Sequence, residues 1–414
     1  MLHLLSLFSG IGAFEKALEN IGADYRLVNY CEIDQYAAGA FARVHGVSED
    51  LNLRDVTTVD PASLPRVDLI TYGFPCQDIS VAGRRRGFVD SEGNSTRSGL
   101  FFEALRIIRG CRPLYAIAEN VKALTSKKFK EEFKTVLDGL AAEGYVNYWA
   151  VLNARDYGVP QNRERVFIIS IRADADMGIF KFPEKIPLTR RLKDVLEDDV
   201  PEKFYISSDR ARSLLESLNA TYRPGKEPDQ AVRAGCSGLM VVEEDSKIMQ
   251  IGNFVTTGNF RNPQRGRVYD PEGASPTLNT VNGGDTMPHI IEPVCAASRG
   301  RNPTNPGDRT PGAGTEQRLE VNRDRLCNTI TTVQKDNYIL EPPFRIRKLT
   351  PRECWRLQGF TDEDFDRAAA GASNSQLYKM AGNSIAVPCL EAIFINLLEG
   401  QHALLEVISG TSQT

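Results

Sequence analysis

Residues 1–175 alternate short apolar runs with amphipathic helical patterns, and this alternation restricts the possible fold more than any other feature of the chain. Strands that alternate with helices indicate an α/β fold built on a doubly wound sheet. In such open sheets, ligands bind beyond the carboxyl ends of the strands. The apolar runs predict strands at 4–7, 26–31, 67–72, 114–118 and 166–171, and the helical patterns fall at 14–21, 35–44, 100–109 and 129–143.

Length and cysteine usage bound the class of protein. A chain of 414 residues is long enough for two or three domains. No apolar run approaches the ~18 to 20 residues of a membrane span, and the apolar start lacks the basic region of a signal peptide. The eight cysteines show no Cys-x-x-Cys spacing, so neither a zinc site nor a disulfide framework is indicated. We expect a cytoplasmic protein that has neither a metal nor a membrane partner.

The composition shifts toward Gly, Pro, Asn and Thr between residues 187 and 343. A weak internal repeat lies in this region, because 275–281 resembles 327–333. Each copy is followed by a similar apolar run, at 289–293 and at 338–342. Two related β units predict a separate, smaller domain made mostly of strands and loops.

Helical periodicity returns toward the end of the chain, at 351–358 and 388–398. We therefore expect the segment 344–414 to rejoin the first domain, which covers 1–186. The region 187–343 is expected to fold apart from both.

A glycine-containing turn follows the first predicted strand. The segment Phe8-Ser9-Gly10-Ile11-Gly12 leads from this strand into a helix, and its glycines allow a nucleotide-like ligand to approach closely. Glu32, at the end of the second predicted strand, is placed to accept a ribose hydroxyl. Asp55-Val56 follows a third element and is placed to read an adenine amino group. The turn alone suits any Rossmann-type cofactor, but the lack of a full Gly-x-Gly-x-x-Gly favours S-adenosylmethionine over a nicotinamide dinucleotide.

A cysteine follows the third predicted strand, in the segment Gly73-Phe74-Pro75-Cys76-Gln77. Buried cysteines are usually inert packing residues. Here, however, a strand gives way to a polar loop, which favours an accessible nucleophile. The following segment, 82–98, is rich in Gly and Arg and has little apolar anchoring, as expected of a lid. Cys76 is therefore a candidate nucleophile, whose thiolate form needs nearby cations.

Charged side chains mark the ends of two later strands. Glu119 ends one apolar run, while Arg163 and Arg165 alternate into the last predicted strand of the sheet, so that both project to one face. Together with Gln161 they suit an anionic or carbonyl-bearing ligand. The alternative is an ordinary salt-bridged sheet edge.

The charges are unevenly distributed along the chain. The formal net charge of −4 argues against a nucleic-acid partner, but local clusters decide such binding. The triplet Arg84-Arg85-Arg86 lies in a Gly-flanked loop, and Arg97 follows it. Loops rich in Gly and Asn in the middle region are either recognition loops or plain surface turns, and they hold Arg261, Arg265, Arg299 and Arg301.

Taken together and in this order, the segments resemble the motifs of bacterial and phage C5-cytosine DNA methyltransferases over nearly the full chain. The family's Pro-Cys, Glu-Asn-Val and Gln-x-Arg-x-Arg motifs match Pro75-Cys76, Glu119-Asn120-Val121 and Gln161-Asn162-Arg163-Glu164-Arg165. Its Arg-x-x-Thr-x-x-Glu and Gln-Gly-Phe motifs match 347–353 and 358–360. Its last motif, which completes the cofactor pocket, matches Gly382-Asn383-Ser384.

The resemblance implies a Rossmann-like, S-adenosylmethionine-dependent methyltransferase domain, a target-recognition domain at 187–343 and double-stranded DNA as the substrate. It implies that Cys76 adds to C6 of a cytosine flipped out of the duplex, whose C5 then takes the methyl group. Glu119 would hold or protonate N3, and Arg165 would hold the O2 edge with support from Arg163. DNA contacts are expected from the lid and its surroundings, at Ser80, Val81, Arg84, Arg85, Arg97 and Gln161.

Departures from the family pattern are small. Ala13 stands where a second glycine is common, and Ile33 stands where an aromatic residue often packs on the adenine. Neither change removes a catalytic group. A monomer suffices for methylation of one strand at a time, and a restriction endonuclease that accompanied the enzyme would act separately.

Three other functions compete with this interpretation. A tRNA cytosine-5 methyltransferase shares the architecture but generally carries a Cys-Phe-Thr signature, which is absent here. An inactive DNA-binding module on the same scaffold is disfavoured by the complete set of catalytic residues. A nicotinamide-dependent oxidoreductase would leave the Pro-Cys and Gln-x-Arg-x-Arg segments unexplained.

Overall fold

The computed structural model describes residues 1–75, 97–190, 192–204 and 349–410, together with the backbone of six strands between 250 and 348. The chain divides into two compact units. The first contains Met1–Val195, Ala274–Gly283 and Pro351–Thr414, and the second contains Leu196–Gly273 and Gly284–Thr350.

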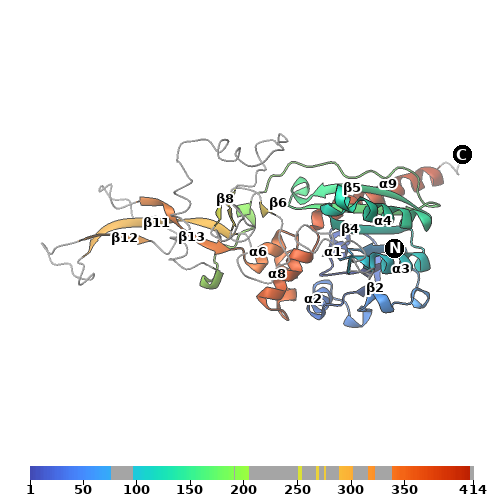
Figure 1. The fold of residues 1–414 in the computed structure, drawn as a ribbon, viewed down its shortest axis with the longest axis horizontal. Coiled ribbons are helices and arrows are strands. Elements are labelled where there is room, and N and C mark those ends of the chain that lie inside the picture. The colour runs from blue at the N-terminus through green and yellow to red at the C-terminus, as the bar shows by residue number, and fades with distance from the viewer. Residues whose placement is uncertain are drawn as a thin grey trace. The chain divides into compact units, whose positions relative to one another are not determined.

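The first unit is built on a six-stranded sheet with the order β2-β1-β3-β4-β7-β5. Figure 1 labels β2, β4 and β5 of this sheet. The pairs β1–β2, β1–β3 and β3–β4 are parallel, while β7 runs antiparallel to both of its neighbours. The sheet therefore has the α/β character expected from the sequence, with one reversed strand. Its strands are β1 (Leu2–Leu7), β2 (Tyr25–Cys31), β3 (Leu69–Tyr72), β4 (Tyr115–Val121), β5 (Tyr145–Asn153) and β7 (Glu164–Arg172).

The strand β5 was not predicted, and its place in the sheet gives the reason. It is the last strand in the sheet order and pairs only with β7 among the described residues. Val146 and Trp149 are exposed there, so apolar and polar positions do not separate into one clear pattern. The five predicted strands all form, with ends that differ by a few residues.

Alternate residues of the central strands point into two different layers. Leu5, Leu7, Ile70 and Tyr72 share one buried cluster with α3 and α4. On the other face, α1 packs against α9, where the rings of Phe14 and Phe394 meet edge to face at 6.4 Å. The helices of this unit are α1 (Ala13–Asn20), α2 (Gln35–His45), α3 (Phe101–Cys111), α4 (Lys130–Ala142), α6 (Pro351–Arg356), α7 (Asp362–Ala369), α8 (Asn374–Asn383) and α9 (Val387–Gly410).

The helices α7 and α8 were missed by the sequence patterns, although each begins with a capping box. The Thr361 side chain accepts from the N–H of Asp364, and the Asp364 carboxylate accepts from the N–H of Thr361. Ser373 and Gln376 repeat this arrangement at the start of α8. The Thr/Ser-x-x-Asp/Gln spacing of these two caps is a signature that can be read from sequence.

The carboxy-terminal segment packs on the first helices of the chain. Lys16 Nζ in α1 lies 2.9 Å from the Asp364 carboxylate in α7, and Arg367 donates to the Val44 carbonyl at the end of α2. The stretch Asn374–Leu398 is long and apolar enough for a membrane span, but 61% of its apolar window is buried inside the protein. It is also interrupted between α8 and α9, as suits a pair of core helices.

In the second unit, the described elements between 284 and 348 are strands. The runs that close the two repeat copies, 289–293 and 338–342, begin β11 (His289–Arg301) and β13 (Tyr338–Lys348), and these two strands pair antiparallel. The other strands of this sheet are β8 (Gln250–Asn253), β9 (Arg267–Tyr269) and β12 (Glu316–Val321). Within the first unit, β10 (Ser275–Pro276) pairs with β6 (Gln161–Asn162).

Candidate active site

The candidate site lies at the carboxyl edge of the sheet. Because β1, β2, β3 and β4 are parallel, the loops that follow them emerge at the same edge. These loops carry the glycine turn, Glu32, the segment that leads to Cys76, and the residues after Glu119. The topology therefore gathers segments that are far apart in the sequence.

The glycine turn has a left-handed backbone at three positions, a conformation that glycine adopts most easily. Phe8, Gly10 and Gly12 have φ angles of 53°, 57° and 81°. Ser9 stabilises the turn, because its single hydroxyl hydrogen is shared between the Ser6 carbonyl at 3.0 Å and the Cys31 carbonyl at 3.3 Å. A Cβ atom at Gly12 would lie 2.0 Å from His45 Nε2, so this glycine is required by space as well as by its φ angle.

Glu32 is joined to the turn by hydrogen bonds. Its Oε2 accepts from the Gly10 N–H at 2.9 Å, and its Oε1 accepts from the Asp34 N–H at 2.8 Å. Burial raises the pKa of Glu32 above its ordinary value, although both backbone donors oppose this. Each carboxylate oxygen has further acceptor capacity, so the group can also receive ribose hydroxyls. Beside it, the Ile33 side chain is 75% exposed and offers an open apolar surface.

Asp55 and Val56 lie at the start of a short 3-10 helix, Val56–Thr58. The Asp55 carboxylate is its N-cap, because Oδ1 accepts from the N–H and hydroxyl of Thr57 at 2.9 and 2.8 Å. Val56 is buried. Sequence reasoning missed Asn52, whose amide makes two 3.0 Å hydrogen bonds with the backbone N–H and carbonyl of Glu32 and so fixes that residue.

Glu119 and Arg165 form an ion pair at this edge. Arg165 Nε lies 3.0 Å from Glu119 Oε1, and the two side chains are 16% and 12% exposed. Burial raises the pKa of the Glu119 carboxyl group, and the positive charges of Arg165 and Arg163 reduce this shift without cancelling it. A Cβ atom at Gly73 would lie 3.6 Å from Glu119 Oε2. The carboxyl group therefore lies beside the segment that leads to Cys76.

Asn120 has a positioning role that sequence reasoning did not assign. Its side chain is 3% exposed, and its Nδ2 donates to the Phe74 carbonyl at 3.1 Å. Its Oδ1 accepts from the N–H of Val121 at 2.9 Å. This amide thus links the end of β4 to the backbone that immediately precedes Pro75, which is itself half-buried.

Arg163 was predicted to support catalysis, and the structure places it in a buried bridge. Its side chain is 3% exposed, and its guanidinium donates to the carbonyls of Gly382 and Ser384. It therefore fixes the segment between α8 and α9, where Asn383 is exposed and Ser384 is buried. The positive charge of Arg163 also lowers the pKa of Glu119.

Gln161 was predicted to contact nucleic acid, but its surroundings favour a structural role. Its side chain is fully buried, and its Nε2 donates to the Leu357 carbonyl at 2.6 Å. A group in this position cannot reach a duplex without leaving its partner.

Several predicted residues cannot be placed. Cys76, Ser80, Val81, Arg84, Arg85, Arg261 and Arg265 lie outside the described residues. The side chains of Arg97, Arg299 and Arg301 also lie outside the description, although their backbone begins a 3-10 helix or belongs to β11.

The described cysteines are poor nucleophiles. Burial raises the pKa of the Cys31 thiol to about 12 and that of Cys111 to about 11, and it also raises the pKa values of Cys354 and Cys389. Only the thiolate attacks carbon efficiently, so these four residues behave as packing groups.

A lysine-rich stretch follows Glu119 and was also missed by sequence reasoning. Lys122, Lys127, Lys128 and Lys130 are exposed on the loops after β4 and at the start of α4. Lys122 pairs with Glu164 at 2.8 Å. The clustering of lysines within a dozen residues of the Glu-Asn-Val segment is a signal that the sequence contains.

Comparisons with known proteins identify the family of the chain. Residues 2–399 match the model of the family described as C-5 cytosine-specific DNA methylase. The orphan methyltransferase M.SPBetaI of Bacillus phage SPbeta is 35% identical, over 96% of this chain and 97% of that protein. The type II methyltransferase M2.ScrFI of Lactococcus lactis subsp. cremoris is 33% identical, over 84% of this chain and 72% of that protein.

Solved structures show the same fold. The Dnmt2 methyltransferase of S. pombe aligns with a TM-score of 0.55 at 17% identity, covering 97% of this chain and 99% of that one. The Entamoeba histolytica methyltransferase EhMeth aligns with a TM-score of 0.58 at 15% identity, covering 97% and 98%. The chain belongs to the C-5 cytosine-specific DNA methylase family. It is an enzyme that methylates cytosine in DNA at C5.

Proposed function

We propose that this enzyme moves a methyl group from S-adenosylmethionine to C5 of a cytosine that is flipped out of duplex DNA, through a covalent bond between Cys76 and C6. The observation that carries the proposal is the half-buried Glu119–Arg165 pair beside Gly73, in the segment that leads to Cys76. In this proposal the carboxyl group, the guanidinium and the cysteine act at N3, O2 and C6 of one cytosine ring.

The residues at the carboxyl edge fit S-adenosylmethionine. The turn at Gly10 leaves open space, since a Cβ atom there would meet no atom within 4 Å. Glu32 has acceptor capacity for a ribose, and the exposed Ile33 provides a surface for an adenine. Asp55 and the segment at Asn383-Ser384 would complete the pocket. When bound, this cofactor supplies a methyl group on a positively charged sulfur.

The chain's own residues would activate the base. C5 of cytosine is a weak nucleophile, so the Cys76 thiolate adds to C6 and the electron pair of the C5–C6 double bond becomes available at C5. Glu119 in its protonated form gives a proton to N3 as charge develops there, and its raised pKa suits this role. Arg165 holds O2. After methyl transfer, loss of the C5 proton to a base restores the double bond and expels Cys76.

Base flipping is required because C6 is shielded in a stacked duplex. Ser80, Val81 and Arg97 would close around the gap, and Arg84 and Arg85 would meet phosphates. The exposed Lys127 and Lys130 lie in the stretch after Glu119, so we infer that they also contact the DNA backbone. Target choice would come from the region 187–343, including Arg261, Arg265, Arg299 and Arg301.

The oligomeric state and the location of the enzyme are also part of the proposal. One copy of the chain contains every proposed catalytic group, so we infer that the enzyme works as a monomer. We infer a cytoplasmic location from the cysteine spacing, which indicates no disulfide framework. A restriction endonuclease that shared the target would act as a separate protein.

The covalent step is tested with duplex DNA that carries 5-fluorocytosine at target sites. Fluorine cannot leave as a cation, so the final elimination is blocked and the bond to Cys76 persists. In the presence of S-adenosylmethionine, we expect an enzyme–DNA complex that survives denaturing electrophoresis with the wild-type chain and is absent with Cys76→Ala. A complex that survives equally in both chains would refute Cys76 as the nucleophile. Trapping on tRNA instead of duplex DNA would identify the competing substrate.

A further inference from the structure

We propose that His45, which belongs to none of the motifs above, is a positioning residue that holds the glycine turn 8–12 in the shape that binds S-adenosylmethionine. This inference rests on the proposed role of that turn. His45 is the last residue of α2, and its ring contacts the turn at Ile11 and Gly12.

The imidazole ring of His45 is held between the turn and α1. Its side chain is 2% exposed. Nε2 lies 3.2 Å from the Ile11 carbonyl, and Nδ1 lies 2.7 Å from Glu19 Oε1. The Phe41 ring packs against the imidazole at 4.7 Å. The ring therefore has one defined orientation and one polar partner on each side.

The turn rests directly on this ring. A Cβ atom at Gly12 would lie 2.0 Å from Nε2 and 2.7 Å from Cδ2 of His45. Gly12, which has the largest positive φ angle in the turn, therefore packs against the imidazole with no room for a Cβ atom. His45 thus fixes the direction of the Ile11 carbonyl, and its ring limits how closely the backbone of Gly12 can approach α2.

The two partners require a hydrogen on both nitrogens. A carbonyl oxygen only accepts, so Nε2 must donate to Ile11, and the Glu19 carboxylate accepts from Nδ1. Burial opposes a charge on His45, but the Glu19 hydrogen bond and the charges of Glu15 and Glu19 outweigh burial and raise its pKa above 6.5. The side chain of Glu19 is 34% exposed, and its pKa is lowered because the hydrogen bond to His45 and the charge of His45 outweigh its partial desolvation.

The raised pKa of His45 predicts how cofactor binding changes with pH. A histidine whose pKa is raised by folding contributes its stabilisation fully below the ordinary value of 6.5 and loses it as pH rises through the raised value. Cofactor affinity should therefore weaken on the alkaline side. Other titratable or charged groups face this cluster from α1, α2, β2 and α7, and they are Glu15, Lys16, Tyr25, Arg43, Asp364 and Arg367.

The test is isothermal titration of the full-length protein with S-adenosylmethionine, at pH values from 6.5 upward. We expect His45→Gln to raise Kd by about tenfold at the lowest pH and to flatten the pH dependence, since a charged hydrogen bond is lost. The kcat at saturating cofactor should change by less than about twofold, because His45 touches no reacting atom. Glu19→Gln retains an acceptor without its charge, so it should move the alkaline loss of affinity to lower pH.

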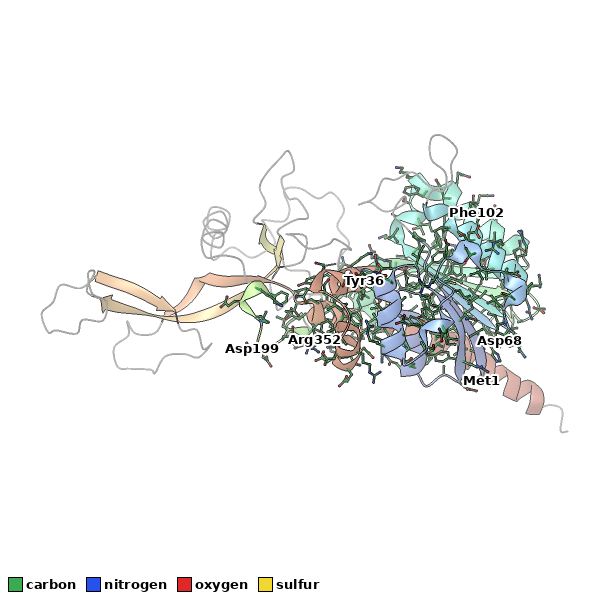
Figure 2. All side chains as sticks on the ribbon, turned by 90° about the horizontal axis from the view of Figure 1, so that it is seen from below. Met1, Tyr36, Asp68, Phe102, Asp199 and Arg352 are labelled. Carbon is green, nitrogen blue, oxygen red and sulfur yellow. The ribbon has the colours of Figure 1, made fainter. Side chains whose placement is uncertain are left out.

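The chain offers a matched control. His3 Nδ1 lies 2.8 Å from Asp68 Oδ2, so this is also a histidine–carboxylate pair. Figure 2 shows Asp68 near Met1, at a distance from Tyr36 in the first turn of α2. His3→Gln should bind the cofactor with the wild-type Kd and pH profile. If it weakened binding as much as His45→Gln does, the effect would be a general loss of a histidine and the proposal would be overturned.

A Glu32→Gln variant distinguishes failure of the proposed role of His45 from failure of the proposed cofactor site. Weakened binding in Glu32→Gln, with wild-type Kd and pH dependence in His45→Gln, would overturn the role of His45 alone. Wild-type binding in both would refute the proposed cofactor turn itself. Should His45→Gln fail to fold, Glu19→Gln decides the matter, and an unshifted pH profile in that variant would contradict the proposal.

Discussion

Glu119 combines two properties that conflict in water. It lies 3.0 Å from a guanidinium, which favours its ionised form, yet burial keeps its pKa above the ordinary value. A carboxyl group in this balance can change its protonation state when a ring nitrogen takes the place of solvent. The proposed mechanism uses this balance, because it requires Glu119 to hold N3 before the reaction and to donate a proton during it.

Replacement of Glu119 by Gln should lower kcat by about 100-fold or more, because the proton donor is lost while the shape is kept. The raised pKa means that the wild-type carboxyl group holds its proton above pH 4.5, so wild-type activity should fall as pH rises through that pKa. The variant should lack this alkaline limb in a single-turnover pH profile. Glu164→Gln is the control, since that exposed carboxylate pairs with Lys122. Wild-type kcat in Glu119→Gln would contradict the assignment.

Replacement of Asn120 by Ala removes a donor to the Phe74 carbonyl and should lower kcat more than it changes KM. The expected cost in unfolding free energy is about 1–3 kcal/mol, measured by urea denaturation. Asn147→Ala is a control, since that amide also donates to a backbone carbonyl, that of Leu137 at 3.1 Å. A similar loss of kcat in both variants would show that the effect is only one of stability.

At the scale of elements, the sequence predicts what is local and misses what depends on distant partners. The strand that ends at Tyr72 and the motifs after it follow from runs of adjacent residues. The contacts of Asn120 and His45 do not, because their backbone partners lie 46 and 34 positions away. Gln161 shows the converse case, in which a motif residue expected to face the ligand is turned into the core.

The glycine turn gives the sharpest prediction at this scale. Gly12→Ala should abolish cofactor binding, because its Cβ would overlap the His45 ring as well as strain a φ of 81°. Gly22→Ala isolates the strain, since that φ is 67° and no atom lies within 4 Å of the added carbon. We expect about 1 kcal/mol from the strain alone and clearly more at Gly12, measured by thermal and urea unfolding. Equal losses in the two variants would contradict the contact with His45.

At the scale of the whole molecule, a net charge of −4 coexists with a DNA substrate, so the binding surface must be local. The exposed lysines after β4 lie in sequence next to Glu119 and belong to the first unit. The division into two units also separates the sheet that carries the candidate site from the strands between 284 and 348. Which bases those strands and their loops read does not follow from a pattern of residue types, because readout depends on side-chain placement against base edges.

Removal of the two lysines tests where the duplex lies. In the double variant Lys127→Gln with Lys130→Gln, the DNA association constant K should depend less steeply on salt. The magnitude of the negative slope of log K against log salt should fall by roughly 2, because two phosphate contacts are lost. Lys134→Gln in α4 is the control, because that lysine pairs with Asp138 at 2.5 Å. An unchanged slope in the double variant would place the duplex elsewhere.

The most direct test of the central claim is bisulfite sequencing of unmethylated duplex DNA after incubation with the protein and S-adenosylmethionine, beside a Cys76→Ala control. We predict cytosines protected at one short recurring sequence with the wild-type chain and no protection with the variant. Conversion of every cytosine in both samples would contradict methylation of duplex DNA by this chain, and protection in both would contradict Cys76 as its nucleophile.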